Sequence, residues 1–129
     1  MKVDYRDGLL FASIKITYKG KSKVIDNVVV DTGAANSLIS QEEVDEIGIR
    51  ISKDDEIVTS YGIGGMEHSF VKAVDKIEIS EFELNNYSID FTNLPYEDVN
   101  GLLWLDVLIE GRFIIDLDIL NIYRKVNIK

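Results

Sequence analysis

Short segments with a β-strand pattern follow one another so closely in this sequence that an all-β fold is expected. Residues 9–18 alternate in polarity, and after a turn at 19–21 a β-branched run extends from Val24 to Val30. Further strands are predicted within 55–79, 82–91, 113–117 and 119–126. Many short strands with little helix predict a small closed or partly open barrel of short antiparallel strands.

Two short helices interrupt this pattern. Ser40 is followed three residues later by Glu43, a capping box that predicts a helix over residues 41–47, ended by Gly48. Residues 105–110 predict a second short helix before Gly111. The chain has 129 residues with one proline and no low-complexity linker, so residues 1–129 are predicted to form a single domain.

Composition and charge exclude several classes of protein. The chain has no cysteine, so disulfides, thiolate nucleophiles and zinc–sulfur sites are excluded. Its formal net charge of −9 argues against nucleic acid and anionic membrane surfaces as partners. The longest apolar runs, 28–30 and 102–105, are too short to span a bilayer, and the first residues lack the apolar core of a signal peptide. A cytoplasmic location is therefore expected.

One acid stands where a charge is unfavourable. Asp31 directly follows three valines, at the end of a predicted buried strand, and is followed by Thr32 and Gly33. Gly33 allows its backbone N–H to approach a neighbouring carboxylate, and Thr32 supplies a hydroxyl. Taken alone, the segment is equally compatible with an Asp that caps a β-turn.

Two further segments favour a catalytic interpretation. Residues 61–65, Tyr-Gly-Ile-Gly-Gly, form the tip of the predicted hairpin over 55–79, and glycines there allow the tip to move as a substrate-covering lid must. Residues 101–108, Gly-Leu-Leu-Trp-Leu-Asp-Val-Leu, follow Asp31 by about seventy positions. Alone, the first would be a plain turn and the second a core strand leading into a helix.

In this order and spacing, the three segments resemble the retropepsin-like aspartic proteases, in a non-retroviral subfamily. The resemblance extends over residues 9–126 and implies an aspartic endopeptidase that needs no metal or cofactor. It implies that Asp31, Thr32 and Gly33 are catalytic. It also implies substrate contacts by residues of the loop, the flap and the third segment: Ala34, Tyr61, Gly62, Ile63, Gly64, Gly65, Leu103 and Trp104.

The chain departs from the family pattern in two places. Trp104 occupies the position of a family glycine, so its side chain must point into a pocket or a subunit interface, or the local backbone must differ. Retroviral members also pair an Asp after the catalytic motif with an Arg after the third motif. Here those positions hold Ala35 and Leu105, both without charge.

The chain supplies one Asp-Thr-Gly, whereas peptide hydrolysis by this route needs two carboxylates around one water. The simplest source of the second is a twofold homodimer that places Asp31 beside its counterpart, and the resemblance implies the same. The expected partners are therefore a second copy of the chain and a peptide or protein substrate, with no nucleic acid and no membrane.

Other interpretations remain open at this stage. The fold could serve as a non-catalytic binding or dimerisation module, for which Trp104 is the best argument. Asp116 and Asp118 form an Asp-x-Asp on one predicted strand face that could hold a metal, although such pairs are more often solvated. His68 is the only histidine, and a lone histidine is more often a surface residue than a ligand or a base.

Overall fold

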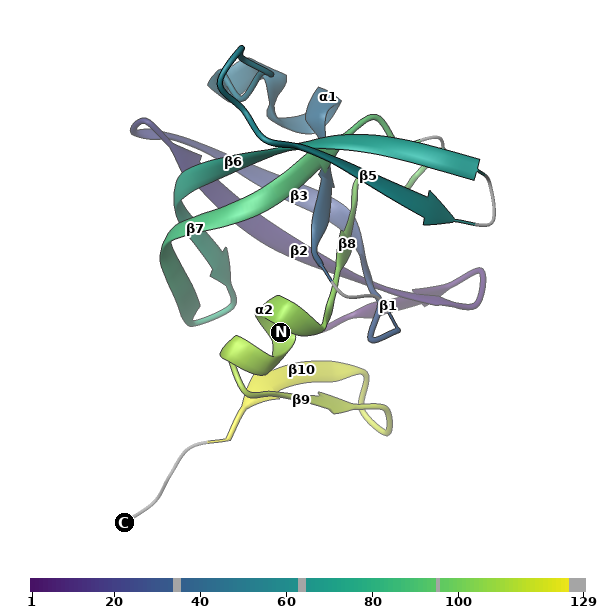
Figure 1. The fold of residues 1–129 in the computed structure, drawn as a ribbon. Helices are drawn as coiled ribbons and strands as arrows, with labels where there is room; N and C mark the ends of the chain where they lie inside the picture. The colour runs from purple at the N-terminus through teal and green to yellow at the C-terminus, as the bar shows by residue number, and fades with distance from the viewer. Residues whose placement is uncertain (34–35, 63–64, 95, 126–129) are drawn as a thin grey trace.

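The computed structural model describes residues 1–33, 36–62, 65–94 and 96–125, and of residues 60–62 and 65–67 it describes the backbone alone. Within this part of the chain, most strands form one eight-stranded sheet (Figure 1). The order across this sheet is β1, β2, β3, β8, β4, β7, β6, β5. Their bounds are Asp4–Arg6, Leu9–Tyr18, Lys21–Val30, Gly101–Leu103, Leu38–Ser40, Phe82–Thr92, Gly65–Ile79 and Ile57–Gly62 respectively.

The sheet curls back on itself. β2 pairs with β1 and β3, and its C-terminal half also pairs with β6, from Lys15 opposite Glu78 to Thr17 opposite Lys76. This extra ladder partly closes the sheet, so the predicted all-β, partly open barrel is confirmed. Most neighbouring strands are antiparallel as expected, but β3 with β8 and β4 with β7 are parallel pairs.

The helical segments lie where the sequence predicted them. α1 (Gln41–Val44) continues into the 3₁₀ helix η1 (Asp45–Ile47), which ends at Gly48 with a left-handed φ of 88°. α2 covers Leu105–Glu110. The predicted capping box is wrong in one respect: Ser40 holds the N-cap position, but its side chain makes no capping hydrogen bond. The chain enters α1 directly from β4, so strand pairing fixes the start of the helix.

A small hairpin of β9 (Phe113–Asp116) and β10 (Asn121–Arg124) lies beside α2 (Figure 1). Within the described residues, the predicted strands over 113–117 and 119–126 are therefore shorter than expected, and Val126 lies outside those residues. The Asp116 carboxylate accepts hydrogen bonds from the backbone N–H groups of Asp118 and Ile119, which closes the turn between the strands. The N-terminus adds to this hairpin, because Val3 N–H donates to Leu120 O at 3.0 Å.

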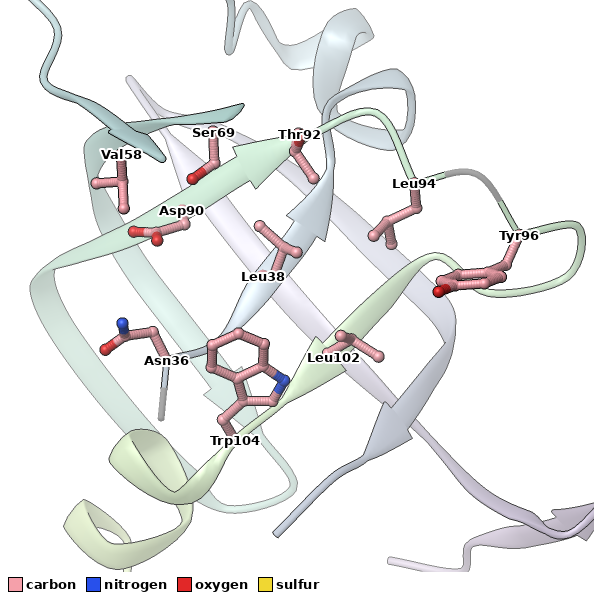
Figure 2. Close-up of a pocket in the computed structure, with 10 residues that line it drawn as sticks. All are labelled: Asn36, Leu38, Val58, Ser69, Asp90, Thr92, Leu94, Tyr96, Leu102 and Trp104. Atoms are coloured by element: carbon pink, nitrogen blue, oxygen red, sulfur yellow. The ribbon is translucent and has the colours of Figure 1, made fainter. Parts of the chain in front are cut away.

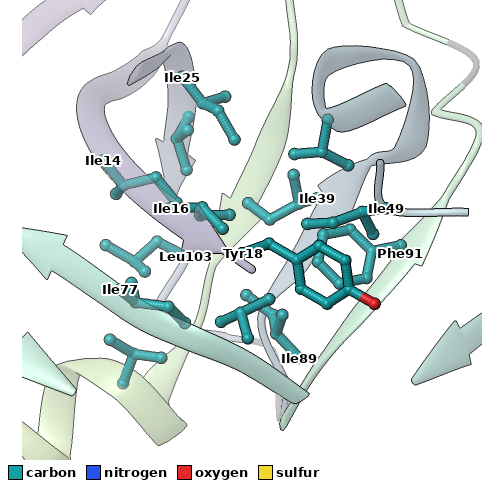
Figure 3. Packing of buried hydrophobic residues seen from close by; sticks show 14 of the residues in the cluster. Ile14, Ile16, Tyr18, Ile25, Ile39, Ile49, Ile77, Ile89, Phe91 and Leu103 are labelled. Atoms are coloured by element: carbon teal, nitrogen blue, oxygen red, sulfur yellow. The ribbon is translucent and has the colours of Figure 1, made fainter. Parts of the chain in front are cut away.

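The core lies inside the curled sheet and consists largely of branched aliphatic side chains (Figure 3). Strand alternation places these residues on one face, while their sequence neighbours point to the other face. Fully buried members include Ile16, Ile25, Ile39, Ile49, Ile77, Phe91 and Leu103. No helix in the described part of the chain is long and apolar enough to cross a membrane.

Candidate active site

β8 lies between β3 and β4, the two strands that the Asp31 loop connects. β3 runs parallel to β8, with Val30 opposite Leu103, and β8 runs antiparallel to β4, with Leu38 opposite Leu102. The loop over 31–37 must therefore pass around the C-terminal end of β8. Asp31 N–H donates to the carbonyl oxygen of Leu103, so Asp31 lies at this end beside the residue that precedes Trp104.

Gly101 makes the insertion of β8 possible. A Cβ atom built at Gly101 would lie 2.7 Å from Ile39 Cδ1, closer than real Cβ contacts, and 3.0 Å from Leu38 O, tighter than most of them. A glycine at this position therefore permits β8 to lie against β4 at the observed distance. The glycine at the start of the third segment is thus explained by close packing of two strands.

Asp31 leaves the ladder at the end of β3. Its backbone N–H donates to Leu103 O at 2.9 Å, so the pairing of β3 with β8 continues one residue beyond the strand. Val28 is fully buried in the core, and alternation puts Asp31 on the opposite face. The Asp31 side chain is accordingly partly buried and not part of the core.

The Asp31 carboxylate is held by its own loop. Gly33 N–H donates to Asp31 Oδ1 at 3.0 Å, and a Cβ at Gly33 would lie 3.4 Å from the same oxygen. Asp31 therefore caps the turn at Gly33, and this capping bond is compatible with a catalytic Asp-Thr-Gly motif. No other hydrogen bond to this carboxylate occurs among the described residues. Thr32 is exposed beside it.

Ser37 ties the Asp31 loop to α2. This serine is 1% exposed, and its Oγ donates to Asp106 Oδ1 at 2.8 Å while its N–H donates to Asp106 Oδ2 at 3.1 Å. The same Oγ accepts the backbone N–H of Trp104 at 3.0 Å. Neither Ser37 nor Asp106 was predicted from the sequence to be a catalytic or substrate-binding residue. Where retroviral members pair two charges, this chain has Ala35 and Leu105, and the polar pair of Ser37 with Asp106 joins the same two segments.

Trp104 projects into a pocket. Its backbone is extended, with φ −101° and ψ −178°, so no special conformation is demanded at the position of the family glycine. Trp104 follows Leu102 on the face opposite the core, and both side chains line a pocket with Leu38 (Figure 2). Its indole Nε1 is buried without a hydrogen-bond partner among the described residues. The Trp104 side chain therefore lies at a pocket, which is one of the alternatives that the sequence left open.

This pocket, called the Trp104 pocket below, has a volume of about 120 Å³. β4, β7 and β8 form its floor, and β5 and β6 contribute Val58 and Ser69 (Figure 2). Asn36 connects it to the Asp31 loop. The lining residues are Asn36, Leu38, Val58, Ser69, Asp90, Thr92, Leu94, Tyr96, Leu102 and Trp104. Leu103, expected to contact substrate, lies in the core at 1% exposure, and Leu102 lines the pocket in its place.

The predicted hairpin over 55–79 is formed by β5 and β6. Their register runs from Ile57 opposite Phe70 to Gly62 opposite Gly65. Ile63 and Gly64 at the tip lie outside the described residues, as does Ala34 of the Asp31 loop. At the base of the hairpin, Asp55 accepts hydrogen bonds from Ser52 N–H and forms an ion pair with Lys72 at 2.9 Å.

The remaining candidates do not gather at this site. His68 faces Thr59 across the hairpin, with 3.1 Å between its Nδ1 and the Thr59 hydroxyl. Asp116 and Asp118 do not share a strand face, because Asp118 lies in the turn after β9. No group of three or more His, Cys, Asp or Glu side chains that could hold a metal ion occurs in residues the structure describes.

Asp90 is an acid that the sequence did not single out. It lies on β7 between the buried residues Ile89 and Phe91, so alternation points its side chain into the Trp104 pocket. Burial raises the pKa of the Asp90 carboxyl, and the charges of Asp106 and Glu56 raise it further. In the sequence, Asp90 occupies a polar position of the alternating pattern Ile89-Asp90-Phe91, so the pattern predicts only a side chain directed away from the core and carries no signal of the pocket.

The model of the family described as "Aspartyl protease" matches residues 14–107. No curated protein matches the chain. Among solved structures, the chain is similar to a retropepsin-like aspartic protease from Rickettsia conorii, with 19% identity and a TM-score of 0.66. The match covers 91% of this chain and 83% of that one. This likeness confirms the retropepsin-like fold that the sequence predicted.

Proposed function

Because this chain belongs to the aspartyl protease family, we propose that it hydrolyses peptide bonds with Asp31 from each of two copies of the chain. Family and fold together support an aspartic peptidase in general terms. The position of Asp31 is the observation that supports it as the catalytic residue. It follows a buried strand, and its backbone N–H donates to Leu103 O. Its carboxylate lies on the side of the sheet that faces away from the core.

The proposed chemistry uses the two carboxylates in different protonation states. The ionised one takes a proton from a water molecule, and the protonated one donates a hydrogen bond to the carbonyl oxygen that the water attacks. Two like charges in contact cannot both ionise, so the pair shares one proton and titrates as a unit. Aspartic peptidases are the standard case of such a pair. Gly33 N–H, which donates to Asp31 Oδ1, orients the carboxylate in this scheme.

The dimer is part of the proposal because one chain lacks the second acid. In the single chain, Asp31 is partly buried, Thr32 and Gly33 are exposed, and this surface is free to meet a copy of itself. A twofold axis beside Asp31 would bring the two loops together and bury both Thr32 side chains. The cytoplasmic location stays a prediction of the sequence.

The substrate-contact residues are proposed on the same basis. The β5–β6 hairpin contributes Val58 and Ser69 to the lining of the Trp104 pocket (Figure 2). Tyr61, Gly62 and Gly65 belong to the end of this hairpin. A peptide held between the hairpin and the floor of the sheet would thus have one side-chain pocket at Trp104.

The test is the loss of activity on Asp31→Asn, with Asp75→Asn as a matched control. Asp75 is an exposed acid on β6, six residues and roughly 20 Å along the strand from Ser69. Both variants remove one negative charge. Hydrolysis of casein and of random peptide pools should disappear in the first and persist in the second, while thermal melting shows that both are folded.

Sedimentation measures the assembly in the same samples. At tens of micromolar, the native protein should have about twice the mass of one chain. Hydrolysis that survives Asp31→Asn would refute the proposed chemistry. A strict monomer that cleaves nothing and does not bind a peptide-like aspartic protease inhibitor would instead favour the non-catalytic binding module.

A further inference from the structure

The floor of the Trp104 pocket carries one ionisable side chain, Asp90, while the other polar residue of the floor, Thr92, donates its hydroxyl to His68 O. Strand alternation sends Ile39, Phe91 and Leu103 into the core and their neighbours Leu38, Asp90 and Leu102 into the pocket. Leucines at two of these three positions make the floor apolar. Asp90 breaks that pattern and brings a carboxylate to a wall where an aliphatic residue would bury more apolar surface (Figure 2).

Within the part of the chain that the structure describes, the Asp90 carboxylate has no partner of opposite charge. Neither a hydrogen bond nor an ion pair to its side chain occurs among the described residues, and no Lys, Arg or His lines the pocket. Lys72 on the adjacent strand is already paired with Asp55 at 2.9 Å. The charges that act on Asp90 from neighbouring elements, Asp106 of α2 and Glu56 before β5, are both negative. The site is therefore short of one positive charge.

The rest of the pocket suits the stem of a long basic side chain. Two aromatic residues, Trp104 and Tyr96, line it and can lie along methylene groups or beneath a cation. Ser69 and Asn36 add oxygen acceptors near its edge. A volume of about 120 Å³ is close to the roughly 150 Å³ cavity that holds one benzene molecule. A pocket of this size suits a single side chain.

We propose that the Trp104 pocket binds a lysine or arginine side chain of the peptide substrate, and that Asp90 is the residue that determines this specificity. The inference rests on the proposed peptidase function and adds to it a class of substrate. A basic side chain supplies the missing charge, whereas an acidic side chain would meet the Asp90 carboxylate, on which the charges of Asp106 and Glu56 also act. Burial of the carboxylate strengthens the pairing, because the local dielectric constant is lower than in water.

The test measures binding separately from cleavage. Trp104 is the only tryptophan of the chain and lines the pocket, so its fluorescence reports occupancy directly. The protein carries Asp31→Asn so that peptides are not consumed. It is titrated at pH 7 with tryptophan-free hexapeptide pools that share one fixed residue: Lys, Arg, Gln, Met or Glu. The Lys and Arg pools should change the fluorescence at concentrations at least about tenfold lower than the Gln, Met and Glu pools.

Two added substitutions assign this preference to Asp90. Asp90→Asn, which keeps size and shape, should remove the difference between the Lys and Gln pools. Asp75→Asn, with the same change in charge on an exposed part of β6, should leave it intact. Equal responses to all pools, no response to any pool, or a preference that persists in Asp90→Asn would each overturn the proposal. The pool comparison without Asp90→Asn is decisive even if that variant does not fold.

Cleavage by the native chain distinguishes this inference from the proposed function. The bonds it cuts in a digest of cellular proteins are identified by mass spectrometry, and Lys or Arg should be enriched at one fixed position beside the cut. Cleavage without such enrichment refutes the role of Asp90 and leaves the peptidase standing. Basic pools that bind selectively to a chain that cuts nothing refute the peptidase and leave the pocket assignment standing.

Discussion

Removal of the Ser37 hydroxyl tests whether the Asp31 loop depends on its link to α2. Ser37 is 1% exposed and makes two side-chain contacts: its Oγ donates to Asp106 Oδ1 at 2.8 Å and accepts Trp104 N–H at 3.0 Å. Ser37→Ala removes a hydrogen bond to a charged group and leaves the Trp104 N–H without an acceptor. Each of these effects destabilises by about 1–3 kcal/mol.

The expected loss of unfolding free energy for Ser37→Ala is therefore about 3 kcal/mol. For a domain of this size, that loss lowers the melting temperature by roughly 10 °C. Ser40→Ala is the matched control, because Ser40 is also buried, at 8% exposure, but makes no capping hydrogen bond. Its melting temperature should fall by no more than about 3 °C.

Thermal unfolding followed by circular dichroism measures both variants. The reasoning also requires coupling: Ser37→Ala combined with Asp106→Asn should destabilise by less than the sum of the single variants, since the two residues share one hydrogen bond. At an assay temperature where Ser37→Ala is still folded, its rate of peptide hydrolysis should be lower than that of the native protein. The reason is that the loop carrying Asp31 has lost its hydrogen bond to α2. If Ser37→Ala melts within 3 °C of the native protein, or no further from it than Ser40→Ala does, the link does not hold the loop.

Three further outcomes follow from single contacts. Gly101→Ala should lower the free energy of unfolding by about 1–3 kcal/mol, since its Cβ would lie 2.7 Å from Ile39 Cδ1. Ile39→Val removes that methyl group, so adding it to Gly101→Ala should restore part of the loss. If the losses of the two single variants simply add, the clash with Ile39 is contradicted. Trp104→Phe keeps an aromatic wall and removes a buried N–H without a described partner, so denaturant titration should show unchanged or higher stability. Lys72 lowers the pKa of Asp55 below its usual 3.8, so this pair stabilises the fold above that pH and the gain is lost as the pH falls through the lower folded value. Asp55→Asn should therefore flatten the decline of stability below about pH 4, and an unchanged acid limb in melting curves would contradict it.

Local sequence determined much of this fold. Alternating and β-branched runs predicted β2 and the end of β3, and the two short helices lie where their residues and terminal glycines placed them. Asp31 was identified from its place after three valines, since an acid there is unfavourable unless the fold uses it. These patterns are local, because each of them determines the conformation of a segment of about ten residues or fewer. The same reasoning failed at Ser40, where a strand and not a capping bond starts the helix.

The tertiary structure decided which face of each strand is buried. Alternation shows that Leu102 and Leu103 point in opposite directions, but it does not say which points to the core. That choice follows from the insertion of β8 between β3 and β4, a pairing between residues about seventy positions apart. The Ser37–Asp106 bond, the position of Trp104 and the exposure of Asp90 to the pocket all depend on it. They were invisible in the sequence because strand pairing is set by long-range packing, while a sequence pattern records only the period of each strand.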